Sequence, residues 1–112
     1  MRKRHASQYA NFGSLHDIQG LALDDEMAMG YTLKTLSAAI WCLYHTESFQ
    51  EGLLAVVNAG GDADTNAAVA CSLLGAKYGF NSIPSYYVDN LKKKSLLDKV
   101  TDDLLYILRQ DV

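Results

Sequence analysis

Residues 60–66 read Gly-Gly-Asp-Ala-Asp-Thr-Asn and separate two apolar segments near the middle of the chain. Consecutive glycines adopt backbone angles that other residues avoid, so they end the preceding helix and permit a sharp turn. Asp62 can then take the N-cap of the next helix, with Asp64 and Thr65 in its first turn. This stretch therefore predicts two helices joined by a turn that gathers three oxygen-bearing side chains.

Helical periodicity extends upstream of this turn. Apolar residues recur at helical spacing over residues 32–44, and Thr32 can cap that helix. Ser48 and Glu51 have the spacing of a capping box, which starts a second helix that runs to the glycines. Both segments have the length and spacing of helices that bury one face.

The downstream sequence predicts three more helices. The helix over residues 62–78 is rich in small apolar residues on nearly every side, which predicts burial all round, and Gly79 ends it. Pro84 suits the first turn of a short helix. Ser95 with Asp98 opens a last helix, whose apolar stripe is Leu96, Leu97, Val100, Leu104, Ile107 and Leu108. No alternating strand pattern occurs, so the predicted class is all-α.

The acidic turn has two interpretations on the pattern alone. Carboxylates are favoured at a helix N-terminus, so Asp62, Asp64 and Thr65 could form a structural cap cluster. A cap needs one acceptor, however, and carboxylates beside a buried helix are costly unless they are paired or bind a cation. Hard cations such as Mg²⁺ prefer these oxygen ligands. An EF-hand is excluded because Ala67 and Leu73 stand where its glycine and glutamate would be.

Composition limits the classes of function. The chain has 112 residues, of which 49% are hydrophobic and 21% charged, as expected for one globular domain. Its net charge of −3 gives no electrostatic support for a nucleic-acid partner. The two cysteines, Cys42 and Cys71, fall in apolar helical runs, which fits a reducing compartment. No apolar run follows the basic residues 2–4, as a signal peptide would require. No uncharged stretch is long enough for a membrane span. We therefore expect a cytoplasmic protein without a signal peptide.

The turn and its surroundings resemble the ADP-ribosylglycohydrolase family. The resemblance lies in Gly-Gly-Asp-x-Asp-Thr at residues 60–65, the small-residue helix after it, and Gly-Ala-Lys-Tyr-Gly at residues 75–79. It extends upstream to residues 30–36 and covers about residues 30–91. Cys71 stands where the family commonly has glycine.

The resemblance implies an all-α orthogonal helical domain with a binuclear site for Mg²⁺ or Mn²⁺. Members of the family cleave ADP-ribose from a modified acceptor. Carried over, Asp62, Asp64 and Thr65 would be metal ligands, and Gly30 and Tyr31 would lie at the ADP-ribose end of the pocket. No catalytic base can be assigned.

The resemblance also exposes a gap. The family draws its other metal ligands from an N-terminal glutamate region and a Thr-Asp-Asp-Thr-like motif, and neither is present here; the acidic residues 24–26 are interpreted as a solvated turn. We therefore expect residues 1–29 to be a weakly patterned segment and residues 30–112 to be the C-terminal part of such a domain. The chain would be inactive alone and would need a separate N-terminal half. The alternative is a non-catalytic helical binding or structural domain.

Overall fold

The structure, a computed structural model, describes residues 17–110. Two short 3₁₀ helices are present, η1 (Ile18–Leu21) and η2 (Phe80–Ser82). The α-helices are α2 (Thr32–His45), α3 (Phe49–Asn58), α4 (Ala63–Tyr78), α5 (Ser85–Asp89) and α6 (Lys94–Gln110). No strand occurs between residues 17 and 110, so the predicted all-α class is confirmed. The basic residues 2–4 and the first part of the predicted segment 1–29 lie outside the described residues.

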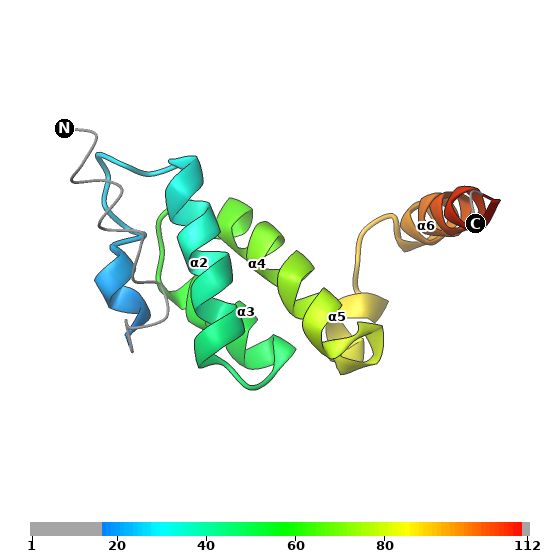
Figure 1. The fold of residues 1–112 in the computed structure, drawn as a ribbon, viewed down its shortest axis with the longest axis horizontal. Coiled ribbons are helices and arrows are strands. Elements are labelled where there is room, and N and C mark those ends of the chain that lie inside the picture. The colour runs from blue at the N-terminus through cyan, green and yellow to red at the C-terminus, as the bar shows by residue number, and fades with distance from the viewer. Residues whose placement is uncertain (1–16, 111–112) are drawn as a thin grey trace.

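Helices α2, α3 and α4 pack together and form the core (Figure 1). Close packing depends on small residues at the contacts. Gly52 of α3 is the clearest case, because a Cβ placed on it would lie 2.4 Å from Cδ1 of Leu74 on α4. The buried apolar side chains of the three helices are Ala38, Ala39, Trp41, Cys42, Phe49, Val56, Ala67, Ala70 and Leu74.

The predicted helix starts are confirmed in part. The Ser48 hydroxyl accepts a hydrogen bond from the Glu51 backbone N–H at 3.1 Å, as the capping box predicts. The Glu51 carboxylate, however, accepts from the N–H of Glu47 at 2.9 Å rather than from that of Ser48. Thr32 was wrongly predicted as a cap: Tyr31 is the N-cap of α2, and Thr32 is already its first helical residue.

Two other predicted starts are shifted by one residue. Pro84 precedes α5 as its N-cap rather than lying in its first turn. Helix α6 begins at Lys94, so Ser95 is inside the helix and cannot cap it. Instead, Lys94 forms an ion pair with Asp98 one turn later, at 2.7 Å. Such exposed pairs stabilise a helix by only about 0.3–0.5 kcal/mol.

The prediction that the helix after the turn is buried on all sides is wrong for this chain. Asn66, Ala67, Ala70 and Leu74 of α4 are buried against α2 and α3. The opposite face, which we call the open face of α4, is solvent-exposed: Ala68, Val69, Ser72 and Ala76. Within the described residues, too few helices pack on α4 to cover a cylinder that is apolar nearly all round.

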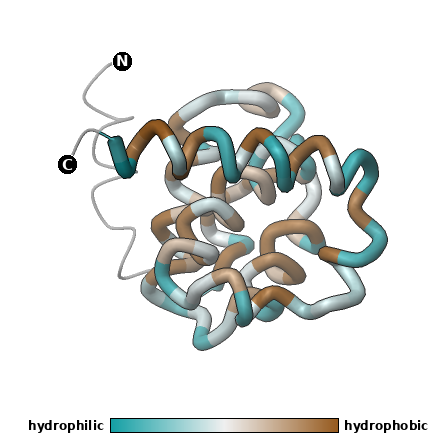
Figure 2. The backbone as a smooth tube through the Cα atoms, turned by 90° about the vertical axis from the view of Figure 1, so that its right-hand side faces the viewer, coloured by the Kyte–Doolittle hydropathy of each residue, from teal (hydrophilic) through white to brown (hydrophobic). Residues whose placement is uncertain are grey.

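Helix α6 lies apart from the three-helix core (Figure 1). None of its residues is buried. The predicted apolar stripe is present but faces solvent; Leu97 and Leu104, for example, are 46% and 54% exposed. Figure 2 shows apolar and polar residues alternating along this helix. No helix in the described part of the chain is long and apolar enough to cross a membrane.

Candidate metal centre at the start of helix α4

The turn between α3 and α4 is made by Gly60 and Gly61. Their φ angles are +79° and +68°, in the left-handed region that favours glycine. Gly61 is also packed against backbone, since a Cβ on it would lie 1.9 Å from the carbonyl oxygen of Leu23. The predicted reason for the two glycines, a sharp turn, is therefore correct but incomplete. A chain segment almost 40 residues away presses against the turn.

Asp62 occupies the N-cap position of α4. Its side chain makes no capping hydrogen bond, and its backbone, at φ −76° and ψ 60°, departs from the extended conformation that N-cap residues usually adopt. The interpretation of the acidic group as a cap cluster requires the Asp62 carboxylate to accept a backbone N–H. The observed geometry therefore removes the main support for that interpretation.

Asp64 lies in the first turn of α4, is exposed, and accepts the Thr65 backbone N–H at 3.0 Å. A hydrogen bond with the Asp62 side chain and this backbone N–H hold the pKa of the Asp64 carboxyl below its ordinary value. The Asp62 and Asp64 carboxyl groups therefore influence each other's ionisation. Neighbouring carboxylates repel each other unless a proton or a cation lies between them, so this pair suits a hard divalent cation.

Thr65 is exposed beside Asp64, so the turn presents two carboxyl groups and one hydroxyl. Among residues 17–110, no group of three or more histidine, cysteine, aspartate or glutamate side chains is arranged to hold a metal ion. Mg²⁺ requires close to six oxygen ligands and keeps waters where the protein supplies few. The turn therefore offers one part of a coordination shell.

The structure places Gly30 beside this turn. Gly30 has a φ of +81°, and a Cβ on it would lie 3.8 Å from Oδ2 of Asp62. Tyr31 follows as the N-cap of α2 and is 40% exposed. Both residues had been assigned to the ADP-ribose end of the site. Gly30 thus lies next to Asp62, while the role of both residues in binding ADP-ribose stays a prediction.

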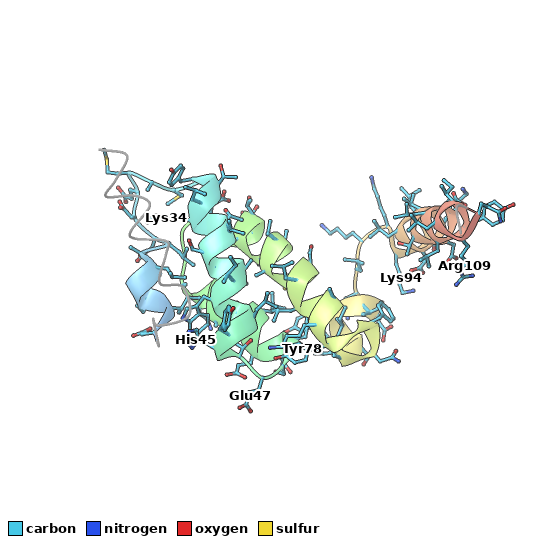
Figure 3. The ribbon with its side chains drawn as sticks, in the orientation of Figure 1. Lys34, His45, Glu47, Tyr78, Lys94 and Arg109 are labelled. Carbon is cyan, nitrogen blue, oxygen red and sulfur yellow. The ribbon has the colours of Figure 1, made fainter. Side chains whose placement is uncertain are left out.

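The segment that touches the glycine turn was not predicted to be structured. Leu23 is only 2% exposed and belongs to the core, whereas the acidic residues after it are exposed, as expected for a solvated turn. Lys34 of α2 fixes the segment by donating a hydrogen bond to the Ala22 carbonyl, and its Nζ lies 3.9 Å from Asp25 Oδ2. Figure 3 shows Lys34 at this end of α2. The apolar spacing of Ile18, Leu21 and Leu23 was the signal available in the sequence.

A second polar pair near the site was also missed. The Thr35 hydroxyl on α2 donates a 2.7 Å hydrogen bond to Oδ1 of Asn66 on α4, and both residues are buried. Asn66 directly follows Thr65 in the first turn of α4. The sequence signal was one amide side chain at the start of a run of alanines.

The structure is all-helical and gathers oxygen-bearing side chains at the start of α4, and comparison with known sequences identifies the family. The ADP-ribosylglycohydrolase family profile matches residues 3–111. The chain belongs to the ADP-ribosylglycohydrolase family.

Two relatives show how much of a family member's length this chain covers. The ADP-ribosylarginine hydrolase Tri1 of Serratia proteamaculans (strain 568) is 32% identical over 79% of this chain, but the match covers 24% of that relative. The ADP-ribosyl-[dinitrogen reductase] glycohydrolase of Rhodospirillum rubrum is 39% identical over 57% of this chain and 22% of its own length. The chain therefore spans about a quarter of these relatives. No solved structure gives a significant match.

Proposed function

We propose that this chain carries one part of the metal site of a hydrolase that removes ADP-ribose from a modified acceptor. The observation that carries the proposal is the Asp62–Asp64 pair: both carboxyl groups lie at one helix start, and the Asp62 side chain is not used as a cap. Asp62, Asp64 and Thr65 would bind Mg²⁺ or Mn²⁺ through oxygen. In the complete site, two such ions would orient ribose hydroxyls and a water.

In this proposal, Gly30 and Tyr31 bind and orient the ADP-ribose group. The Gly30 backbone lies against Asp62 and, having no Cβ, leaves room there for an ADP-ribose group. Tyr31 offers a partly exposed ring and hydroxyl next to it. No carboxylate of the described residues joins Asp62 and Asp64 in a metal-binding group, so we assign no general base to this chain.

The missing ligands would come from a polypeptide that corresponds to the rest of the relatives. The open face of α4 begins at Ala68, three residues after Thr65, and consists mainly of small residues, so a neighbouring helix could approach it closely and bring ligands to the same end. The chain alone would then bind cations weakly and would not hydrolyse ADP-ribosyl bonds.

Hydrolysis of ADP-ribosylated protein tests the proposal, with the chain alone and after adding a polypeptide equivalent to the N-terminal part of a relative. Because the Serratia relative is named an ADP-ribosylarginine hydrolase, ADP-ribosylated arginine is the first substrate to assay. We expect activity only in the mixture with Mg²⁺ or Mn²⁺, and its loss in Asp64→Asn. Asp102→Asn, which changes an exposed carboxylate on α6, should retain activity. No turnover in the complemented mixture would instead favour the non-catalytic domain.

A further inference from the structure

The hydrogen bond between Thr35 and Asn66 joins the two segments that the proposed site uses. Thr35 lies in the first turn of α2, where its backbone N–H donates to the Tyr31 carbonyl at 3.3 Å. Asn66 lies in the first turn of α4, where its backbone N–H donates to the Asp62 carbonyl at 2.9 Å. One side-chain contact therefore connects the backbone of Tyr31 to the backbone of Asp62.

Burial makes this contact restrictive. Thr35 is 7% and Asn66 is 3% exposed, and the Thr35 hydroxyl is 2.7 Å from Asn66 Oδ1. A buried polar group that loses its partner is costly, so the two helices cannot slide or rotate against each other without breaking a bond that water cannot replace. An apolar pair of similar size would fill the same space but would permit several registers.

The position of the bond matches the geometry on which the site depends. The Gly30 backbone must lie against the Asp62 carboxylate, and a Cβ on Gly30 would be 3.8 Å from Asp62 Oδ2. Asp62, Asp64 and Thr65 all precede Asn66 within one helical turn. A rotation of this turn would therefore displace every predicted ligand together.

We propose that Thr35 and Asn66 are positioning residues, whose buried hydrogen bond holds the metal-ligand turn of α4 in register with the segment formed by Gly30 and Tyr31. The proposal rests on the proposed function for the identity of the ligands. The orientation of the turn itself can be measured without a metal. Groups that hydrogen-bond a metal ligand change metal affinity by about 10- to 100-fold when they are removed, and the Thr35–Asn66 pair acts one step further out, through the backbone of the ligand turn.

The test compares Thr35→Val with Thr35→Ser and with a control, Thr46→Val, in the full chain. Valine keeps the shape of threonine and removes only the hydroxyl, whereas serine keeps the hydroxyl. Thr46 is also buried, and its hydroxyl donates to the Cys42 carbonyl at 2.7 Å, at the far end of α2. Thr46→Val thus removes a comparable buried hydrogen bond without touching the site.

Two readouts are needed. The first is amide hydrogen exchange at Asn66 compared with Gly79, whose N–H donates to the Gly75 carbonyl at the other end of α4. Thr35→Val should accelerate exchange at Asn66 by about tenfold or more and leave Gly79 unchanged, since the bond holds one end of the helix. Thr35→Ser should restore protection. If Thr35→Val accelerated exchange equally at Asn66 and Gly79, in the same way as the control Thr46→Val, the proposal would be overturned.

The second readout is Mn²⁺ binding, followed by the electron paramagnetic resonance signal of the free ion. Thr35→Val should weaken binding about tenfold, and Thr46→Val should leave it unchanged. Unaltered Mn²⁺ affinity in Thr35→Val would contradict the positioning role. If Mn²⁺ binding by the native chain does not depend on Asp62 and Asp64, the proposed function fails, and amide exchange still decides whether the pair positions the turn.

Discussion

Gly61 lies so close to Leu23 that a Cβ on the glycine would be 1.9 Å from the leucine carbonyl oxygen. The φ of Gly61, +68°, adds a conformational cost for any other residue. We therefore expect Gly61→Ala to destabilise the fold by about 2–4 kcal/mol, because backbone must move where two segments meet. Urea unfolding followed by circular dichroism measures this loss.

Gly75→Ala is the matched control for that substitution. Gly75 is inside α4, and a Cβ on it would meet nothing within 4 Å. Alanine favours a helix interior over glycine by about 0.5–1 kcal/mol, so the control should be neutral or stabilising. Equal effects of the two substitutions would show that Leu23 does not press on the turn.

Asp64 should titrate below its ordinary value of 3.8. A lowered pKa means that the charged form is present at and above pH 4 and is lost only as the pH falls through the lower value. Because the hydrogen bond with Asp62 is the largest cause, Asp62→Ala should move the pKa of Asp64 upward toward 3.8. Carboxyl carbon chemical shifts measured against pH test this, and an unchanged pKa in Asp62→Ala would be the contrary result.

Cys42 should be nearly inert in the folded chain. Burial, with the nearby Cys71, raises the pKa of Cys42 to about 12 from 9.0, which lowers the thiolate fraction at pH 8 roughly a thousandfold. Burial also raises the pKa of the Cys71 thiol, but Cys71 is only partly buried, so we expect Cys42 to be the slower thiol. Thiol-reagent kinetics on Cys71→Ala and Cys42→Ala separate the two groups.

The same shift predicts a pH dependence of stability. The folded state holds the Cys42 proton more tightly, so its contribution to stability is complete below pH 9 and is lost as the pH rises toward 12. In Cys42→Ala this part of the alkaline destabilisation should disappear. Reaction of native Cys42 as fast as in urea would contradict both expectations.

The α6 stripe should bind a dye that reports apolar surface. None of the α6 residues is buried, and Val100 and Ile107 are 55% and 58% exposed. Ending the chain after Leu91 should remove much of the dye signal and change the melting temperature by only a few degrees, since the core loses no packing. A large fall in melting temperature would show that α6 covers the core in solution.

Local patterns were sufficient to predict the helices and the turn. Ser48 lies at its predicted cap and Gly79 ends α4, because both depend on groups within four residues along the chain. The start of α2 was misplaced because Thr32 has a hydroxyl that can cap a helix, whereas the observed N-cap, Tyr31, makes no side-chain capping bond. Helix boundaries depend on such details and shift by one or two residues.

Contacts between distant segments could not be predicted from one sequence. Nothing in the local pattern indicates that Leu23 packs on Gly61, or that Thr35 meets Asn66 across 31 residues. The burial of the open face of α4 was mispredicted for a related reason. Apolar residues all round a helix show that other helices can pack on every side of it. They do not show that those helices belong to the same chain. The candidate ligands were predicted from their spacing, whereas Gly30 was assigned to the site only because of the family resemblance.

We expect the Asp62–Asp64 pair to bind a divalent cation. Mn²⁺ titration of the full chain, followed by electron paramagnetic resonance, measures this directly at one pH and ionic strength. We expect weak binding that is abolished by Asp62→Asn and by Asp64→Asn, and unaffected by Asp102→Asn. Mn²⁺ binding that is equal in all four proteins, or absent from the native chain at millimolar Mn²⁺, would contradict it.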